Sequence, residues 1–363
     1  MKTVGILGGG QLGWMTILEG RKLGYRFLVL DESPDAPASR VADRWFPPEQ
    51  VEDFCREADV ITYEFEHIDE EVLSRLGGEV RPSLEVLELK RSRIREKTFL
   101  SRRGYPVCRF READRETLEE ALEEIGYPAV VKSESLGYDG KGQYRIASPA
   151  DLEDLKGAAG ERFLVEEFVP FTSEISAVGV RSRSGEIKVY PVTENVHEGG
   201  ILLYNYVSSR REVERAVVSI VSELMEELSL VGLLAVEFFL TEEEDLLINE
   251  FAPRPHNTGH YTLDGTYTSQ FENLLRVVTD LPPGSTKLKL SAGMVNILGL
   301  SLEDIDLREV LSVEGARLYW YGKKKRPRRK MGHVNVVATD RRELTGKMGR
   351  ILDLLYRKEF TLR

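Results

Sequence analysis

Short apolar runs alternate with amphipathic stretches over residues 3–80 of the chain. Apolar runs that end in glycine or aspartate predict buried strands, and apolar residues at helical spacing predict the helices between them. Strands are expected at 3–7, 27–30 and 60–63, and helices at 12–23 and 49–58. This order predicts a doubly wound α/β unit built on a parallel sheet.

A charged helical stretch at 85–100 follows this unit, and Pro106 is expected to begin a new module. Strand-like and helix-like segments are mixed from there onward. Strands are expected at 129–133, 143–146, 163–168, 175–180, 187–191, 235–240 and 246–251, and helices at 149–157 and 212–230. Because no low-complexity linker separates these segments, the domains are expected to share a central cleft.

Composition and charge narrow the classes of function. With 363 residues, 41% of them hydrophobic, the chain can fill more than one core, which excludes a disordered protein. Its 61 acidic and 50 basic side chains give a formal charge of −11, so binding of nucleic acid or a membrane surface is not expected. Seven of the eight residues at 323–330 are cations, however, so anions are expected to bind at local clusters.

Neither a membrane span nor a cysteine-based site is predicted. No apolar run reaches the roughly 18 residues that a span needs, and the glycine-rich start does not resemble a signal peptide. Cys55 and Cys108 lie far apart in the chain, without the neighbours of a disulfide framework or a zinc site. A cytoplasmic protein is therefore expected.

A glycine loop after the first strand is one candidate ligand site. Gly8, Gly10 and Gly13 match the pattern G-x-G-x-x-G, and Asp31 lies at the end of the next strand. This spacing is typical of dinucleotide binding, because backbone amides and a helix N-terminus face the phosphates. A tight turn that binds nothing, or that binds another anion, would show the same pattern. An NAD-dependent oxidoreductase and these alternatives all stay open at this point.

A second glycine-rich loop joins the strands expected at 129–133 and 143–146. It contains Gly137, Gly140 and Gly142, which allow close approach of the backbone to a ligand. Lys132 and Lys141 add positive charge, so the loop could close over a polyphosphate. It is not a Walker motif, because no G-K-[ST] opens a helix here. The alternative is a solvated hairpin.

Two glutamates are predicted to face each other across the last expected hairpin. If its acidic turn centres between Glu243 and Glu244, Glu237 lies opposite Glu250. Two carboxylates in such apolar surroundings repel each other. Mg²⁺ would remove the conflict, with substrate phosphates completing its shell and Asn249 adding a nearby carbonyl. In the alternative register, shifted by one residue, one glutamate points into solvent.

The segment after this hairpin, residues 252–260, is dense in polar groups. Arg254 suits bidentate binding of a carboxylate, bicarbonate or phosphate. His256, Asn257 and His260 could position a substrate, although a histidine in a loop is more often a structural hydrogen bonder. The two histidines are four residues apart in a loop with proline and glycine, which does not predict a zinc site.

Several short motifs occur in order along nearly the whole chain. They are GGGQLG from Gly8, YEFE at 63–66, residues 93–97, GYDGKGQ from Gly137, EEFV at 166–169, Glu194-Asn195, NEFAPR at 249–254, HNTGH at 256–260, TSQF at 268–271 and KMGH at 330–333. Together they make the chain resemble the ATP-grasp enzymes and, among them, the 5-(carboxyamino)imidazole ribonucleotide synthases. Trp14 and Thr258 depart from the usual arginine and serine of this family, and neither departure affects the assignment.

The resemblance implies an ATP-grasp fold that combines α/β and α+β parts. A Rossmann-like pre-ATP-grasp domain is expected over 1–95, a small lid domain with the glycine-rich loop over 96–172, and a catalytic, metal-binding domain with a C-terminal subdomain over 173–363. In this family the first glycine loop helps to form the ribonucleotide side of the cleft and does not bind NAD.

The resemblance also implies an activity in purine biosynthesis. ATP and bicarbonate would carboxylate 5-aminoimidazole ribonucleotide through carboxyphosphate, with release of ADP and phosphate. The expected cofactors are ATP and Mg²⁺, as two ions that Mn²⁺ could replace. The expected partners are these small molecules and a second copy of the chain in a homodimer, with neither nucleic acid nor membrane. No covalent nucleophile is required, and no activated serine or cysteine constellation is visible.

The same resemblance assigns roles to individual residues. ATP is expected to contact Arg93, Lys132, Gly137, Tyr138, Asp139, Gly140, Lys141, Gly142, Gln143, Glu166, Glu167, Phe168, Val169, Glu174, His197, Asn249 and Glu250. The ribonucleotide is expected to contact Glu66, Tyr138, Asp139, Arg254, His256 and Asn257, with Lys323 and Arg329 at its 5′-phosphate. Catalytic roles are expected for Arg254, Lys141, Asp139 and His256. Mg²⁺ is expected at Glu237 and Glu250.

Three competing hypotheses remain at the level of the sequence. Another ATP-grasp ligase, such as a formate-dependent glycinamide ribonucleotide transformylase, would share most of the motifs. An NAD-dependent oxidoreductase would explain only the first glycine loop, and not the second loop or the facing glutamates. A non-enzymatic nucleic-acid binder would rest only on the basic run at 323–330.

Overall fold

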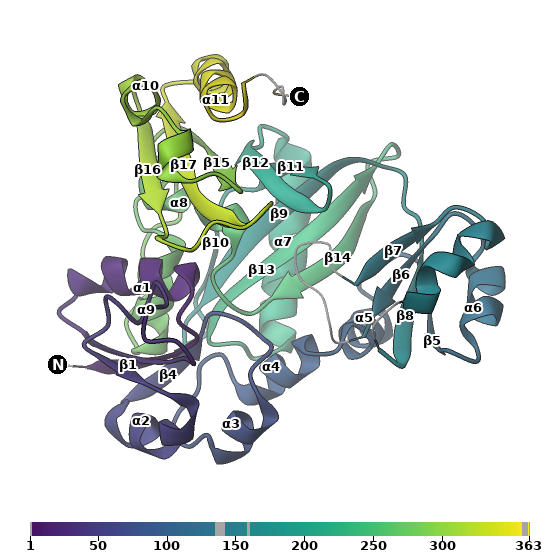
Figure 1. Ribbon diagram of the computed structural model, residues 1–363, viewed down its shortest axis with the longest axis horizontal. Helices are drawn as coiled ribbons and strands as arrows, with labels where there is room; N and C mark the ends of the chain where they lie inside the picture. Colours follow the sequence, from purple (N-terminus) through teal and green to yellow (C-terminus); the bar gives the residue numbers. More distant parts are fainter. Residues whose placement is uncertain (1, 135–141, 158–159, 358–361, 363) are drawn as a thin grey trace.

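Three β-sheets organise the protein (Figure 1). The computed structural model describes residues 2–134, 142–157, 160–357 and 362. The N-terminal domain lies at one end of the molecule, the small lid sheet at the opposite side, and a long sheet runs between them. Among the described residues, no helix has the length and apolar character needed to cross a membrane.

The N-terminal sheet is parallel, with the strand order β3-β2-β1-β4. Its strands are β1 (Thr3–Leu7), β2 (Arg26–Leu30), β3 (Arg44–Phe46) and β4 (Val60–Tyr63), and its helices are α1 (Gln11–Arg21), α2 (Val51–Glu57) and α3 (Glu70–Arg75). The four residues at the end of β1 and all of β4 are buried, as parallel strands covered on both faces require. The predicted doubly wound unit is confirmed.

The connection to the lid differs from the prediction, because the expected single helix at 85–100 is two helices. The first is α4 (Leu84–Lys90) and the second is α5 (Arg93–Arg102). Ser92 takes an extended backbone conformation between them, and its hydroxyl accepts a hydrogen bond from the Arg95 amide. A serine N-cap starts a new helix in this way, and the charged periodicity of the segment does not reveal it.

The lid is a four-stranded antiparallel sheet in the order β5-β8-β6-β7. It consists of β5 (Phe110–Asp114), α6 (Leu118–Ile125), β6 (Ala129–Ser133), β7 (Gln143–Ile146) and β8 (Arg162–Glu167). The segment Pro149–Gly157, predicted as an ordinary helix, is a 3₁₀ helix. Asp151 accepts hydrogen bonds from the amides of Ala147 and Ser148, which closes a tight turn at its start.

The central sheet runs in the order β14-β13-β9-β11-β12-β15-β17-β16, with β10 beside β9. Its strands are β9 (Phe171–Arg181), β10 (Ile187–Val189), β11 (Thr193–Glu198), β12 (Ile201–Val207), β13 (Gly232–Thr241), β14 (Leu246–Ala252), β15 (Ser291–Leu298), β16 (Ala316–Trp320) and β17 (Lys330–Ala338). Its helices are α7 (Arg211–Glu227), α8 (Thr262–Gly265), α9 (Gln270–Val278), α10 (Leu307–Ser312) and α11 (Arg341–Tyr356).

Two hydrophobic cores fix the position of the central sheet. On one face, Ile175 and Ala177 of β9 pack with the apolar stripe of α7. On the other face, Val178 and Val180 pack in one cluster with β1, β2 and α9. Successive side chains of a strand point to opposite faces, so β9 contributes to both cores. The N-terminal domain is thereby fixed against the sheet that carries the predicted glutamate pair.

Candidate active site

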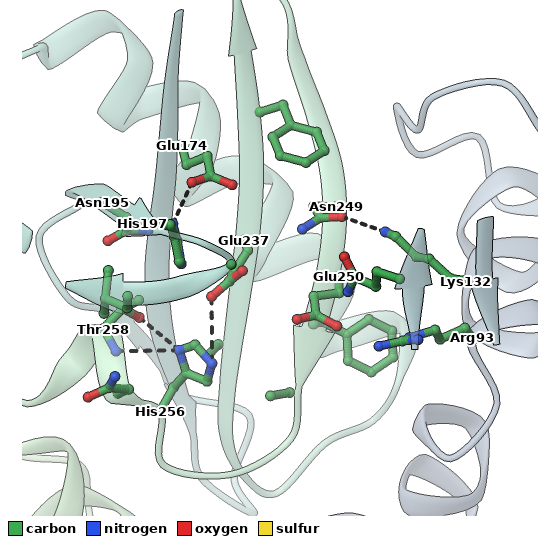
Figure 2. A pocket seen from close by; sticks show the side chains of 18 of the residues that line it. Arg93, Lys132, Glu174, Asn195, His197, Glu237, Asn249, Glu250, His256 and Thr258 are labelled. Atoms are coloured by element: carbon green, nitrogen blue, oxygen red, sulfur yellow. Dashed lines mark hydrogen bonds and ion pairs between the residues drawn. The ribbon is translucent and has the colours of Figure 1, made fainter. Parts of the chain in front are cut away.

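A cleft of about 1180 Å³ lies where the three sheets approach one another. Figure 2 shows side chains from the central sheet on one side of it, facing Lys132 and Arg93 on the other. Most of the residues predicted from the sequence line this cleft. They are Glu66, Arg93, Lys132, Gln143, Glu166, Glu167, Phe168, Val169, Glu174, His197, Glu237, Asn249, Glu250, Arg254, His256 and Asn257.

The remaining predicted residues fall into two groups. Gly137, Tyr138, Asp139, Gly140 and Lys141 lie outside the described residues. The others, Gly142, Lys323 and Arg329, are described and do not line the cleft. The Gly142 carbonyl accepts a hydrogen bond from Ser133, which closes the base of the lid hairpin.

The facing glutamates are present, because Glu237 pairs directly with Glu250 across β13 and β14. The route to this pairing differs from the prediction. Next to the turn, Phe238 pairs with Ile248, and the register shifts by one residue between Glu237 and Phe238. Asn249 is the extra residue of the resulting β-bulge. The bulge also explains why Asn249 and Glu250, adjacent in sequence, both line the cleft, which a regular strand does not allow (Figure 2).

The two carboxyl groups have opposite electrostatic environments. Burial, together with the charge of Glu250, raises the pKa of Glu237 to about 7. Burial also acts on Glu250, but the charges of Lys90, Arg93 and Lys132 outweigh it and lower the pKa of Glu250 below its usual range. The pair is therefore a carboxylate beside a carboxyl that loses its proton near neutral pH.

His256 lies on the other side of Glu237. Its Nε2 atom is 3.6 Å from a Glu237 carboxylate oxygen, and its Nδ1 atom is 3.0 Å from the Thr258 hydroxyl (Figure 2). Burial and the nearby charges of Arg254 and Lys330 lower the pKa of His256 well below its ordinary value. The imidazole is therefore neutral at pH 7, and it can orient a neighbouring group without adding charge.

A network of buried ions joins the lid to the hairpin of β13 and β14. Glu166, at the end of β8, lies 2.8 Å from Lys97 and 2.6 Å from Lys132. Although burial opposes ionisation, these two lysines lower the pKa of Glu166 to about 2. Lys132 also donates to the Asn249 side-chain oxygen at 3.1 Å, and Lys97 donates to the Asn249 carbonyl at 2.9 Å. The bulge residue is thus bound from both sides.

The chain passes from the lid to the central sheet through residues 166–169. Glu167 is bound at both oxygens by Arg109, and the Phe168 amide donates to the Pro128 carbonyl at 3.2 Å. Just beyond, Phe171 stacks on Phe239 with ring centroids 4.8 Å apart, and both rings line the cleft. A backbone segment beside apolar rings suits the edge and faces of a purine base.

Glu174 and His197 form a hydrogen-bonded pair that lies above Glu237 in the view of Figure 2. His197 Nδ1 and a Glu174 oxygen make a short hydrogen bond (Figure 2). Although burial acts in the opposite direction, this contact raises the pKa of His197. The pair offers a carboxylate and an imidazole to a ligand hydroxyl.

Arg254 and Asn257 present polar groups on the side of the N-terminal domain. Arg254 Nε lies 2.9 Å from Glu66, in a buried ion pair that joins the segments after β4 and after β14. Among the described residues, neither polar atom of the buried Asn257 side chain has a hydrogen-bond partner. Buried polar groups in native proteins are normally satisfied, so this amide is available for a ligand.

The first glycine loop is filled by the protein's own carboxylates. Glu64, just after β4, accepts hydrogen bonds from the amides of Gly10 and Gly13, the latter at 2.8 Å. Asp31 accepts one from the Gly9 amide at 2.7 Å. The amides that a dinucleotide phosphate would need are therefore already hydrogen-bonded within the chain. These contacts argue against the NAD interpretation of this loop.

The basic run at 323–330 is divided between several contacts. Lys323 bonds to the Gln11 side chain at the start of α1, and Arg329 donates to the Lys324 carbonyl at 3.1 Å. Lys325 pairs with Asp304 at 2.5 Å. Lys330 lines the cleft itself. The role predicted for Lys323 and Arg329 at a 5′-phosphate stays a prediction.

Some residues of the cleft were missed by the sequence analysis. They are Gln11, Glu64, Lys90, Asn195 and Lys330. Asn195 belongs to the Glu194-Asn195 motif, and Lys330 begins the KMGH motif, so the motifs themselves were the available signal. Lys90 belongs to no motif and has no sequence signal.

Three family models match the chain in order. A ribonucleotide synthetase preATP-grasp domain matches residues 1–90, an ATP-grasp domain matches 98–271, and a phosphoribosylaminoimidazole carboxylase C-terminal domain matches 292–347. The first match covers the N-terminal sheet, the second the lid and strands β9 to β14 of the central sheet, and the third the C-terminal strands of that sheet.

Relatives of known sequence and structure match over almost the full length. An N5-carboxyaminoimidazole ribonucleotide synthase of Aquifex aeolicus is 55% identical over 98% of this chain and 97% of its own. The crystal structure of the phosphoribosylaminoimidazole carboxylase ATPase subunit from Aquifex aeolicus has a TM-score of 0.86 and 52% identity, covering 97% of this chain and 99% of the other. An Aspergillus clavatus N5-carboxyaminoimidazole synthase, solved with ADP and 5-aminoimidazole ribonucleotide, has a TM-score of 0.89 and 29% identity, covering 98% and 99%.

Proposed function

Because the chain belongs to the N5-carboxyaminoimidazole ribonucleotide synthase family, we propose that it carboxylates 5-aminoimidazole ribonucleotide with ATP and bicarbonate. It is an ATP-grasp ligase, and the products of the proposed reaction are 5-(carboxyamino)imidazole ribonucleotide, ADP and phosphate. The observation that carries the proposal is the pairing of Glu237 with Glu250 opposite Lys132 and Arg93 in one cleft. Acidic and basic groups facing each other in this way suit a polyphosphate bound with a divalent cation.

The nucleotide side of the proposal rests on the lid and its connection. The backbone of 166–169 and the rings of Phe171 and Phe239 suit the adenine base. Glu174 and His197 suit the ribose hydroxyls, and Arg93 and Lys132 suit the phosphates. Each of these groups is held by its neighbours before any ligand binds, which reduces the entropy cost of binding.

The donor set at the hairpin fits Mg²⁺. Among the described residues, no group of three or more histidine, cysteine, aspartate or glutamate side chains could hold a metal ion. Two carboxylates whose remaining ligands are phosphate oxygens and water are the usual protein contribution to magnesium sites. Glu237 and Glu250 would hold the metal, which supplies neutralisation of the charge on the transferring phosphoryl group. Two ions, or Mn²⁺ in their place, belong to the same proposal.

The chain's own residues would then control the carboxyl transfer. Arg254, with its guanidinium oriented by Glu66, suits the anionic bicarbonate and the carboxyphosphate formed from it. His256 is neutral and buried, so it can orient the exocyclic amine of the ribonucleotide without repelling Arg254. Asn257 offers an amide to the same substrate. Enclosure of these groups by the lid would exclude water from a labile mixed anhydride.

Roles outside the described residues stay part of the proposal. Asp139 and Lys141 are proposed as catalytic groups on the lid loop, with Tyr138 as a further contact to the ribonucleotide. Lys323 and Arg329 are proposed at its 5′-phosphate, on the strength of their position beside Gln11 and Lys330. Measuring KM for the ribonucleotide in a Lys323→Ala variant tests that assignment, and an unchanged KM contradicts it.

Domain limits and assembly complete the proposal. The proposed domains are 1–95, 96–172 and 173–363. The boundary after residue 95 falls inside α5, and the boundary after residue 172 falls inside β9. Limited proteolysis with mass spectrometry tests them. A homodimer is proposed from the family resemblance, and sedimentation equilibrium tests it.

An ADP-release assay tests the activity. We expect release to require both bicarbonate and 5-aminoimidazole ribonucleotide and to ignore formate. Release that needs formate and not bicarbonate would instead select a formate-dependent ligase. Glu250→Gln keeps the shape of the side chain and removes its charge, so we expect it to abolish turnover while the melting temperature stays near that of the parent. Near-normal activity of this variant would contradict the metal assignment.

A further inference from the structure

Lys90, the last residue of α4, places an ammonium group directly against Glu250. Its Nζ atom lies 3.1 Å from Glu250 Oε2 and 2.8 Å from Glu96 Oε2. The Lys90 side chain is only 11% exposed and lines the cleft. Its Nζ atom is also 5.8 Å from the centroid of the Phe251 ring. The contact joins residues 160 positions apart in the chain.

Glu96 holds this ammonium in place. One of its carboxylate oxygens binds Lys90, and the other accepts a hydrogen bond from the Phe251 amide at 2.7 Å. Phe251 follows Glu250 in β14, so Glu96 is anchored to the same strand as the carboxylate that Lys90 contacts. Lys90 is therefore held beside Glu250 by a carboxylate that is itself anchored, and it does not need to be recruited when a ligand binds.

We propose that Lys90 is a positioning residue of this cleft, a permanent counter-ion of Glu250 that shares the charge neutralisation otherwise left to a divalent cation. It thereby sets how strongly nucleotide binding depends on Mg²⁺. Lys90 binds Oε2 of Glu250, and no hydrogen bond or ion pair within the described part of the chain involves Oε1. The inference rests on the proposed function, because it takes the nucleotide phosphates and the cation to meet at Glu250.

The charges explain why this matters. Without a cation, Glu237 and Glu250 face each other across the ladder, and when both are ionised they repel a polyphosphate. The Lys90 ammonium, which is shared with Glu96, offsets part of this negative charge at contact distance. A divalent cation at the pair does the same, so the effects of Lys90 and Mg²⁺ on nucleotide affinity overlap. Lys90 and Mg²⁺ both reduce the same negative charge, so each contributes less to nucleotide affinity when the other is present. This negative coupling is measurable as a change in ligand affinity.

The test is ADP binding, measured by isothermal titration calorimetry in EDTA and at saturating Mg²⁺. Lys90→Met keeps the aliphatic stem and removes the charge. We expect metal-free ADP affinity to fall about tenfold in this variant, and affinity with Mg²⁺ to change less than about twofold. Lys90→Arg keeps the charge and is expected to resemble the parent protein. An equal loss in both conditions, or no loss in either, overturns the proposal, because a merely structural role would not depend on Mg²⁺.

Two controls keep the result interpretable. Lys22 also lies between two glutamates, at 3.1 Å from Glu19 and 2.6 Å from Glu272, but it is 53% exposed and lies outside the cleft. Lys22→Met is therefore expected to leave ADP binding unchanged in both conditions. If Lys90→Met alone does not fold, the double variant Lys90→Met/Glu96→Gln removes the buried pair together and is subject to the same comparison.

The two possible failures are distinguishable. If the parent protein binds no ADP in either condition, the proposed function and this inference both fail. If the parent binds ADP with a normal gain from Mg²⁺, and Lys90→Met shows the same gain, this inference alone fails.

Discussion

Replacing Lys97 by methionine tests the ion network that joins the lid to the hairpin of β13 and β14. The Lys97 and Glu166 side chains are 3% and 4% exposed and lie 2.8 Å apart. Lys97 also donates to the carbonyls of Asn249 and Ile248, at 2.9 and 3.3 Å. Methionine fills a similar volume without the charge or the donors. The loss therefore reports the polar interactions and not a cavity.

The magnitude follows from the environment of Glu166. At 1.36 kcal/mol per pH unit, a pKa lowered from 4.5 to about 2 corresponds to about 3 kcal/mol of stabilisation at pH 7. Lys132 and Lys97 both contribute to this stabilisation, so replacing Lys97 removes only part of it. The two carbonyl contacts add about 1 kcal/mol. We therefore expect Lys97→Met to lower the free energy of unfolding by about 2 to 3 kcal/mol, less than an unpaired buried charge would cost.

The difference in unfolding free energy between the parent and Lys97→Met is expected to depend on pH. A carboxyl with a depressed pKa stabilises the fold fully above its unfolded value of 4.5, and this stabilisation is lost as the pH falls toward about 2. The difference between parent and variant should therefore shrink between pH 7 and pH 3. Urea unfolding followed by circular dichroism at both pH values measures it. A difference below about 1 kcal/mol at pH 7, or one that does not shrink in acid, would refute the reasoning.

Three further outcomes follow from the cleft. Arg254→Lys should lower kcat/KM for the ribonucleotide about 100-fold at saturating ATP, because an ammonium cannot replace the oriented guanidinium; a loss under threefold contradicts the role. Since the pKa of Glu237 is raised to about 7, the half-saturating Mg²⁺ concentration should be higher at pH 6 than at pH 8, and a flat profile from calorimetric Mg²⁺ titrations argues against it. Asn249→Ala removes the acceptor of Lys132 and should raise KM for ATP about fivefold, which steady-state kinetics will check.

Much of the fold was predictable because its strands are short, buried and clearly bounded. The runs at 3–7, 60–63, 129–133 and 143–146 have the observed bounds of β1, β4, β6 and β7. The break between α4 and α5 was not predictable from periodicity, because one serine cap decides it and the charged pattern continues through it. The kind of helix at 149–157 depends on a local turn, which composition does not determine.

The candidate site was partly predictable, for reasons that differ between residues. Counting outward from the turn predicted Glu237 opposite Glu250, and the pairing is confirmed. Near the turn, the two strands pair one residue away from the assumed register. The bulge at Asn249 restores the assumed register before Glu237 and Glu250 are reached, so the count still gave the correct pair. Lys90 was missed because its contact with Glu250 depends on how α4 packs against a strand 160 residues away. No local pattern carries that information.

The hydrogen bonds between Glu64 and the first glycine loop, called the clasp below, affect whether a dissolved ligand can compete for the amides of that loop. A carboxylate carried by the same chain has an effective concentration at the loop that a dissolved dinucleotide does not approach. It cannot diffuse away while β4 stays paired with β1. The phosphate-binding position of the glycine loop is therefore already occupied by a carboxylate of the same chain. Because a Cβ at Gly10 would overlap the Glu64 carboxylate, the glycine spacing is required for the clasp itself. At this position the G-x-G-x-x-G pattern serves hydrogen bonds within the chain, from the loop amides to Glu64.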